Sequence, residues 1–263
     1  MEGLYIIKSK NTFFLVKVKK SFSEGDYDIR VSPVSRRDGE EIITDDACLT
    51  IEISSSFSEY SAMIDYVGFH EGCSLFDPME RGVGTRDMIK STLSLCKKLF
   101  GISKFTLYDA SQFECPETGG GVGLAVHNLL VYGKSWYERK FDAAPSSSHD
   151  SLIWEQSKKL LSSVVEESKA RRIKGVIEGI FQGKDQERFL EIVNDAVIER
   201  ITWNQMFENM NLSHNGCVFF TGRMIDTVTD MFGIPMVDSW YIPITDEDAS
   251  EYLVAYEKIS PYD

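Results

Sequence analysis

The chain has 263 residues, of which 43% are hydrophobic and 26% charged, so it is long enough for one large domain or two small ones with apolar cores. Aspartate and glutamate outnumber lysine and arginine by 41 to 28, and the formal net charge is -13. This balance argues against a general nucleic-acid-binding surface, which needs a basic face; it suits cationic partners such as amines or basic protein segments, or simply keeps the protein dispersed.

The first seventy residues carry the pattern of a mainly antiparallel sheet. Runs rich in β-branched and aromatic residues predict strands over 4–8, 12–20, 27–34, 48–53 and 60–69. Asn11 lies between the first two runs as a turn residue, so these two strands are expected to form a hairpin. The last two are expected to pair through a short polar turn.

A glycine turn, Gly82-Val83-Gly84, separates these strands from a predicted helix over 86–100. Apolar residues recur every three to four positions from Met88 to Phe100, as a buried helical face requires. Two glycines let the backbone approach a ligand closely, and the first N–H groups of a helix have no partner inside it. The turn is therefore a candidate seat for phosphate oxygens, although a Gly-x-Gly also occurs at tight turns that bind nothing.

The next predicted strand, 104–108, runs into Asp109 and Ser111. Ligands of open α/β sheets gather beyond the C-terminal ends of strands, so these two residues are candidate substrate-binding residues. A solvated turn is the alternative reading of Asp-Ala-Ser. A helix is predicted after it, over 122–132.

Small, turn-forming residues at 143–148 divide the chain into an α/β part, residues 1–145, and a mainly helical part, residues 146–263. Apolar residues at helical spacing predict helices within 151–182, 186–209 and 217–232. A strand is predicted over 239–244, and a capping box at Thr245 opens a last helix that extends to about Ile259. The helical part either stands as a separate region or completes the sheet of the first part through strand 239–244.

The five cysteines show no C-x-x-C spacing, and their odd number leaves at least one unpaired in a monomer, which favours a reducing compartment. No apolar run reaches the roughly 18 residues of a membrane span, and the N-terminus lacks the basic start of a secretion signal. We therefore expect a soluble, intracellular protein. The four histidines have no metal-ligand partner at short spacing, so no metal site and no Cys-His or Ser-His-Asp arrangement is predicted.

The order of these elements, with the turn Arg81-Gly82-Val83-Gly84-Thr85 at its centre, resembles the GNAT family of acetyl-CoA-dependent N-acetyltransferases. That family carries Gln/Arg-x-x-Gly-x-Gly/Ala at the pyrophosphate of acetyl-CoA and, later, a Tyr-Glu-Lys-x-Gly-Phe-like segment. Residues 79–84 match both glycines but not the first position, and residues 137–141 match the second segment without its glycine. The resemblance covers about residues 45–142 and implies a GNAT-like α/β fold with a mixed, mainly antiparallel sheet and flanking helices.

The resemblance also implies roles for particular residues. Backbone amides of Arg81, Gly82, Val83, Gly84 and Thr85 would hold the pyrophosphate of acetyl-CoA. Tyr137 would protonate the departing thiolate. Asp65 or Glu71 would take the proton from the acceptor amine and attract its positive charge, unless these acids are merely solvated. The family works mostly by direct attack of a positioned amine, so the remaining contributions are orientation and stabilisation of the carbonyl oxygen by a strand N–H.

A fuller set of segments, from Glu71-Gly72-Cys73-Ser74-Leu75 to Tyr132–Glu138, is also similar to GNAT-like proteins of large double-stranded DNA viruses. Two functions follow from the resemblance. One is acetyl-CoA-dependent transfer to an amine of a small molecule or a basic protein. The other is a non-catalytic structural or interaction protein with a degenerate GNAT fold, such as a minor virion or capsid component within a larger assembly. A viral protein of this kind would lie in the host cytoplasm or in the virion.

Overall fold

The computed structural model of the protein describes residues 1–21, 25–32, 34–37, 40–43, 47–56, 59–68, 71–75, 78–80, 82–108 and 112–259. For residues 34–37, 40–43, 56, 59 and 71 it describes the backbone alone. The chain forms two units, the first from Met1–Tyr108 and Tyr241–Asp263, the second from Asp109–Trp240.

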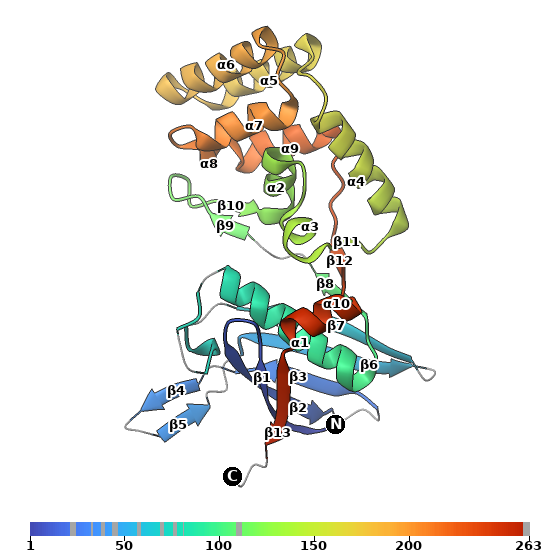
Figure 1. The fold of residues 1–263 in the computed structure, drawn as a ribbon. Helices are drawn as coiled ribbons and strands as arrows, with labels where there is room; N and C mark the ends of the chain where they lie inside the picture. The colour runs from blue at the N-terminus through green and yellow to red at the C-terminus, as the bar shows by residue number, and fades with distance from the viewer. Residues whose placement is uncertain are drawn as a thin grey trace. The chain divides into compact units, whose positions relative to one another are not determined.

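The first unit is built on a sheet (Figure 1). Its strands are β1 (Gly3–Lys8), β2 (Phe13–Lys20), β3 (Tyr27–Val31), β6 (Leu49–Ser56), β7 (Glu59–Val67), β8 (Lys104–Tyr108), β12 (Ser239–Pro243) and β13 (Ala255–Ile259). They follow the order β12-β8-β7-β6-β3-β2-β1-β13. The pairs from β7 to β13 in this order are antiparallel, and β7 pairs with β8 in parallel. A separate hairpin joins β4 (Val34–Arg37) to β5 (Glu40–Ile43), and a 3-10 turn, η1, spans Glu71–Cys73.

Two helices lie together on this sheet, α1 (Val83–Phe100) and α10 (Asp246–Tyr252) (Figure 1). α1 begins after Gly82 and ends at Gly101, whose φ of 76° is the left-handed conformation that glycine adopts without strain. The core of the unit consists of apolar side chains from the sheet and from α1. Its members include Ile7, Phe14, Val16, Ile29, Ile51, Ile64, Met88, Leu93, Leu95 and Phe105.

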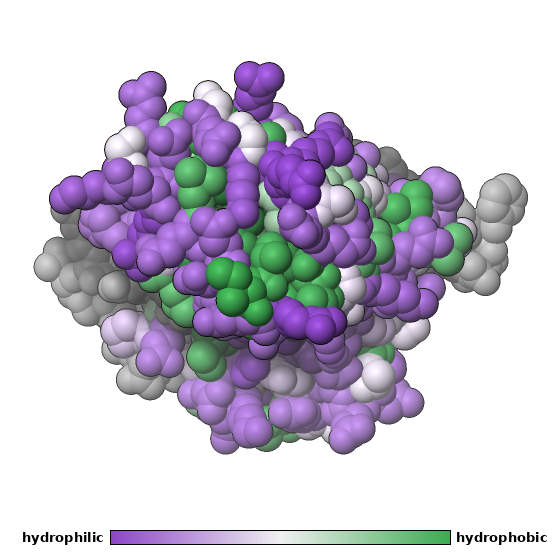
Figure 2. All heavy atoms as spheres, turned by 90° about the horizontal axis from the view of Figure 1, so that it is seen from above, coloured by the Kyte–Doolittle hydropathy of each residue, from purple (hydrophilic) through white to green (hydrophobic). Residues whose placement is uncertain are grey.

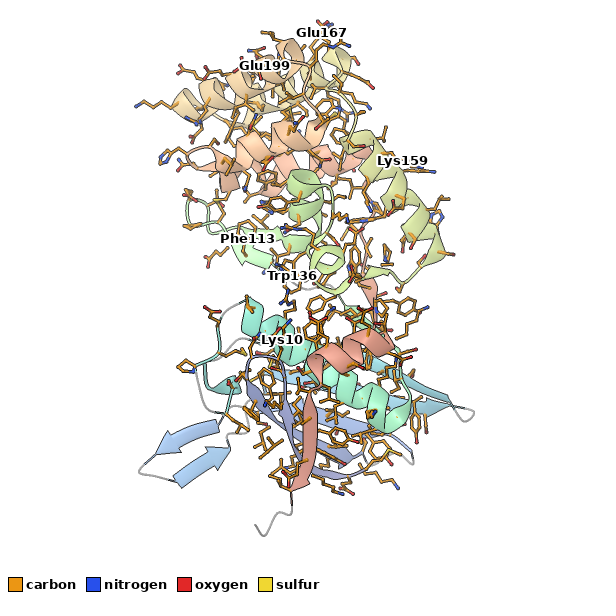
Figure 3. The ribbon with its side chains drawn as sticks, viewed as in Figure 1. Lys10, Phe113, Trp136, Lys159, Glu167 and Glu199 are labelled. Atoms are coloured by element: carbon orange, nitrogen blue, oxygen red, sulfur yellow. A yellow bond between two sulfur atoms is a disulfide. The ribbon has the colours of Figure 1, made fainter. Side chains whose placement is uncertain are left out.

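The second unit is mainly helical. Its helices are α2 (Leu124–Tyr132), α3 (Trp136–Phe141), α4 (Ser148–Leu161), α5 (Glu167–Ile180), α6 (Gly183–Ile198), α7 (Trp203–Leu212), α8 (Gly216–Phe219) and α9 (Gly222–Phe232). A hairpin joins β9 (Gln112–Glu114) to β10 (Gly121–Gly123), and β11 (Ala144–Pro145) lies next to the start of β12, where the Ser146 amide donates to the Ser239 carbonyl at 3.0 Å. Figure 3 shows Glu167 at the start of α5 and Glu199 just after α6, on the outer helices.

Aromatic residues form the core of the second unit. One cluster joins Trp154 and Trp240, whose ring centroids are 5.1 Å apart, to Tyr137 of α3. A second cluster lies among the helices from α5 to α9, and its members are Phe181, Phe189, Trp203, Phe207, Phe219 and Phe232. The face seen in Figure 2 is mostly hydrophilic, with apolar side chains gathered in a small area near its middle. The amphipathic helices therefore direct their apolar stripes inward, as their spacing predicted.

The predicted α/β class with a mostly antiparallel sheet is confirmed, and five predicted strands correspond to β1, β2, β3, β6 and β7 within a few residues. The division of the chain differs from the predicted boundary near residue 145. The second unit begins at Asp109, and the chain returns to the first unit at Tyr241. The expectation that strand 239–244 completes the first sheet agrees with the place of β12.

Four predicted helices are shorter than expected. Residues 151–182 contain most of α4 and all of α5. The two helices are separated near Val165, whose amide donates a hydrogen bond of 2.9 Å to the Ile201 carbonyl. Residues 186–209 contain most of α6 and the first part of α7. Residues 217–232 contain α8 and α9. The predicted last helix ends at Tyr252 instead of about Ile259, because residues 255–259 pair with β1 as β13. The breaks near Val165 and at residues 255–259 coincide with backbone partners that are distant in the sequence. Between α8 and α9 the amides of Phe220 and Thr221 donate locally, to the carbonyls of Cys217 and Val218.

The five cysteines all lie in the described part of the chain. Cys48 is bonded to Cys73 and Cys115 to Cys217, and Cys96 is free and buried. The unpaired cysteine expected from the odd number is therefore Cys96. Two disulfides are more typical of an oxidising compartment, so the cysteines no longer favour a reducing one. Among the described residues, no helix combines the length and apolar character that crossing a membrane demands.

Candidate functional site

The glycine turn places its two glycines differently. Gly82 precedes α1 with a φ of 87°, and no side chain caps the helix there. Val83, Gly84 and Thr85 are already in the first helical turn. The Gly84 amide donates to the Glu80 carbonyl at 2.9 Å, whereas the described residues supply no acceptor for the amides of Gly82 and Val83. Of the four predicted pyrophosphate donors that the structure describes, Gly84 is thus engaged, whereas the amides of Gly82, Val83 and Thr85 have no acceptor among the described residues.

Gly84 is surrounded by protein. A Cβ atom at this position would lie 2.4 Å from Cγ of Met79, whose side chain is only 4% exposed. By contrast, a Cβ at Gly82 would meet no atom of the described residues within 4 Å. The absence of a side chain at Gly84 is therefore explained by the close approach of Met79, without any ligand.

A cleft of about 370 Å³ adjoins this turn. Its lining includes Glu80, Val83, Gly84 and Asp87 together with residues of the β1–β2 turn and the segment before α1. Asp87 is buried and accepts a hydrogen bond of 2.6 Å from Nδ2 of Asn11. The Arg86 guanidinium lies 3.6 Å from the same carboxylate. The cleft thus presents two carboxylates, and the arginine beside it is directed to one of them.

Asp65 lies at an irregularity in β7. Thr50 of β6 is opposite Tyr66, and the next residue, Ile51, is opposite Ile64, so Asp65 is an extra residue in its strand. Its side chain is exposed. Such a β-bulge interrupts the ladder and turns a backbone N–H away from it, and bulges are frequent beside active sites. β7 pairs with β8 at Ala62, Met63 and Ile64, just before this bulge.

Tyr137 is buried, with 1% of its surface exposed. Its ring lies 5.3 Å from the rings of both Trp136 and Trp240. Helix α3 is held at its start by a capping box in which the Ser135 hydroxyl accepts from the Glu138 amide and the Glu138 carboxylate accepts from the Ser135 amide. Tyr137 and Phe141 of the segment 137–141 are therefore part of the aromatic core of the second unit.

Four predicted site residues have no described side chain. Arg81, Asp109 and Ser111 lie outside the described residues, and of Glu71 the backbone alone is described, in η1. The described site in the first unit therefore consists of the turn from Gly82 to Thr85, its cleft and the Asp65 bulge.

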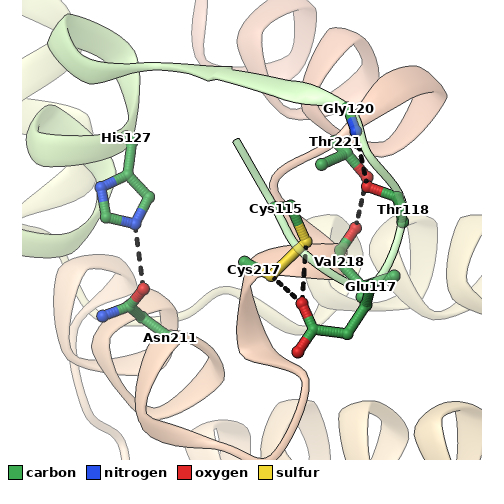
Figure 4. Close-up of a disulfide and its surroundings, with 9 residues drawn as sticks. All are labelled: Cys115, Glu117, Thr118, Gly120, His127, Asn211, Cys217, Val218 and Thr221. Carbon is green, nitrogen blue, oxygen red and sulfur yellow. Dashed lines mark hydrogen bonds between the residues drawn. A yellow bond between two sulfur atoms is a disulfide. The ribbon is translucent and has the colours of Figure 1, made fainter. Parts of the chain in front are cut away.

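Sequence spacing did not indicate the group that lies around the second disulfide. Cys115, Glu117 and Cys217 have one sulfur or carboxylate oxygen each within 4.8 Å of the others (Figure 4). Cys115 and Cys217 are separated by 102 positions, so no short motif joins them. Glu117, two positions after Cys115, is the only nearby residue in the sequence that could have indicated this group.

His127 of α2 lies apart from this group in Figure 4. Its Nε2 is 2.9 Å from Oδ1 of Asn211, and its ring contacts those of Phe113 and Phe220 at 5.1 and 4.8 Å. Burial lowers the pKa of the His127 imidazole, and the hydrogen bond with Asn211 partly opposes this shift. His127 is thus a core histidine.

Comparison of the chain with protein-family models, curated proteins and solved structures finds no match. The functional argument therefore depends on the residues themselves.

Proposed function

We propose that the protein is a non-catalytic structural or interaction protein whose first unit is a degenerate relative of the acetyl-CoA-binding GNAT arrangement. The observation that carries this proposal is the packing of Met79 against Gly84. A Cβ on Gly84 would lie 2.4 Å from Cγ of Met79, and the Gly84 amide is bonded to the Glu80 carbonyl. A diphosphate seat needs open backbone and free amides at this point, but at Gly84 the amide is already bonded and Met79 fills the side on which a Cβ would lie.

The charges of the cleft support the same proposal. Acetyl-CoA would bring a negatively charged diphosphate to a cleft lined by Glu80 and Asp87. Like charges repel more strongly where water is partly excluded, and Asp87 is buried. The guanidinium of Arg86, 3.6 Å from Asp87, is already directed to a carboxylate.

A titration tests the proposal. We expect acetyl-CoA up to millimolar concentration to give no saturable heat in calorimetry and no shift in the melting temperature. A ligand at one hundred times its dissociation constant stabilises a protein by about 2.7 kcal/mol, so binding in the micromolar range would be seen easily. We also expect the chain to occur at fixed stoichiometry in a larger assembly in its native source. Saturable binding of acetyl-CoA would overturn the proposal.

The second candidate function is acetyl-CoA-dependent N-acetyl transfer to an amine. It is favoured by the bulge at Asp65 beside the parallel pair β7 and β8, because an N–H turned out of the ladder is suited to a carbonyl oxygen. The amides of Gly82, Val83 and Thr85, which have no acceptor among the described residues, would be the remaining donors to a pyrophosphate.

Val83→Asp separates the two candidates. Val83 is the first residue of α1 and is 47% exposed, and a carboxylate at the start of a helix is favourable, so the variant should fold. If the transferase candidate is right, wild-type protein and Val83→Asn bind acetyl-CoA, and Val83→Asp binds it at least about tenfold more weakly because its charge repels the pyrophosphate. If none of the three binds, the non-catalytic proposal stands.

A further inference from the structure

The loop between β9 and β10 carries Cys115 and Glu117 and is closed by its own backbone. The Cys115 amide donates to the Gly120 carbonyl at 2.9 Å, and the Gly119 amide donates to the Cys115 carbonyl at 2.8 Å. Pro116, between the two side chains, restricts φ at its position. The loop therefore holds Cys115 and Glu117 in place without help from the disulfide.

Cys217 is held by a separate set of contacts. It lies in α8, and a Cβ on the preceding Gly216 would be 2.4 Å from the Met210 carbonyl oxygen, so this end of α8 sits directly on the end of α7. Phe219 and Phe220, which follow, are buried in the aromatic core. Cys217 is thus expected to keep its position when its bond to Cys115 is broken.

The carboxylate of Glu117 lies against both sulfurs (Figure 4). Its Oε2 is 2.7 Å from Sγ of Cys217 and 3.3 Å from Sγ of Cys115. A disulfide sulfur has no proton to donate, so these contacts are not hydrogen bonds while the disulfide is formed. Among the described residues, Glu117 forms no ion pair. The Glu117 carboxylate is therefore free of an ion-pair partner among the described residues and lies within reach of a cation placed between its oxygen and the two sulfurs.

We propose that Cys115, Cys217 and Glu117 form a zinc-binding site when the disulfide is reduced. A thiol reductant passes two electrons and two protons to the disulfide, which yields two cysteine thiols and the disulfide of the reductant. Zn²⁺ then displaces the two thiol protons and forms two zinc–sulfur bonds and one bond to the Glu117 carboxylate. The fourth position of the tetrahedron is left to water, as in zinc sites with three protein ligands.

The geometry suits this ion. Zinc–sulfur bonds of about 2.3 Å at a tetrahedral angle place the two sulfurs about 3.8 Å apart. The Cα atoms of Cys115 and Cys217 are 5.6 Å apart, so rotation of the side chains alone reaches that separation. Two thiolates select zinc over magnesium or calcium, which prefer oxygen ligands. Glu117 is exposed and Cys217 partly exposed, which leaves a path for the ion.

The test uses the full chain, reduced with dithiothreitol that is then removed under anaerobic conditions. We expect calorimetry to show one Zn²⁺ bound per chain, and Co²⁺ to give thiolate-to-metal charge-transfer absorption. The oxidised protein should bind neither ion. Glu117→Gln, which leaves both cysteines intact, should weaken Zn²⁺ binding at least about tenfold.

Two cysteine pairs serve as matched variants. The double variant Cys115→Ser, Cys217→Ser should lose binding, whereas Cys48→Ser, Cys73→Ser should retain it, since its removed disulfide lies outside the proposed site. Circular dichroism of each reduced protein shows whether it is folded. The proposal is overturned if reduced wild-type protein binds Zn²⁺ no better than the Cys115/Cys217 variant, or if reduction unfolds the protein with and without Zn²⁺.

Discussion

Single glycines show how a residue's neighbours decide its role. Gly84 and Gly175 both lie in helices, but a Cβ on Gly84 would press on Met79, and a Cβ on Gly175 would meet no atom within 4 Å. Helix propensity favours alanine over glycine at both places by about 1 kcal/mol. The difference between the stability changes that alanine causes at Gly84 and at Gly175 therefore measures packing.

Gly84→Ala should lower the free energy of unfolding by about 1 kcal/mol, because overpacking a buried site costs about 1–3 kcal/mol and outweighs the gain in propensity. Gly175→Ala, the matched control, should raise it by roughly 0.5–1 kcal/mol. Urea denaturation measures both changes. A Gly84→Ala protein as stable as wild type would mean that Met79 moves aside freely, and would remove the main support for the non-catalytic proposal.

His127 should make stability depend on pH. Its pKa is lowered by burial, so near and below the pKa of about 6.5 of a free imidazole the unfolded chain binds a proton that the folded chain does not. Stability then falls as the pH falls, by up to about 1.4 kcal/mol per pH unit. Denaturation between pH 7.5 and about 5 should show this slope in wild type and in the exposed-site control His149→Gln, and a smaller slope in His127→Gln. Equal slopes in all three would contradict the assignment.

At the scale of elements, several polar contacts join α10 to α1. Nζ of Lys90 lies 2.9 Å from Oδ1 of Asp248 and 4.9 Å from the centre of the Tyr252 ring, and the Ser91 hydroxyl donates to the Tyr252 carbonyl. Burial alone would raise the pKa of the Asp248 carboxyl, but hydrogen bonds from Lys90 and Thr245 outweigh it, so the pKa is lowered. Removal of the buried Lys90 leaves the Asp248 carboxylate with its hydrogen bonds from Thr245 but without the ammonium group that lies 2.9 Å from it.

Lys90→Ala should therefore lower the free energy of unfolding by about 3 kcal/mol, since Lys90 is only 6% exposed. Asp246→Asn is the matched control: it removes the partner of Lys97 on the same helix, but the Asp246 carboxylate is 99% exposed, and such pairs contribute little. Thermal and urea unfolding of both variants measure the two losses of stability. Similar losses in both would show that the Lys90 pair is no stronger than a surface pair.

At the scale of the whole molecule, the two units differ in how the chain supplies them. The second unit, Asp109–Trp240, is continuous, whereas the first needs Tyr241–Asp263 to provide β13, α10 and most of β12. Without them, the edge of β1 and the face of α1 that contacts α10 would be exposed.

A fragment of residues 109–240 should fold by itself, and a fragment of residues 1–108 should not. A third fragment, in which 1–108 is joined to 241–263 by a glycine-serine linker, should regain a cooperative transition. Circular dichroism and urea unfolding report each outcome. A folded 1–108 fragment would mean that the sheet is stable without residues 241–263.

Local patterns in the sequence determined which segments form strands and helices. Alternation in β2 and the three-to-four spacing of Met88 to Phe100 depend on near neighbours, so they could be recognised without the fold. The same is true of the glycine turn, and of the one unpaired cysteine that an odd number requires. The resemblance to acetyltransferases likewise concerned local motifs.

Only the tertiary structure decided which distant groups meet. It placed Met79 against Gly84, paired residues 255–259 with β1 instead of extending a helix, buried Tyr137 among tryptophans, and brought Cys217 to Cys115 across 102 positions. These contacts depend on the path of the whole chain. A local sequence pattern does not specify that path. The physical reason is that periodicity records which side of an element is buried, whereas the identity of the neighbour is set by long-range packing.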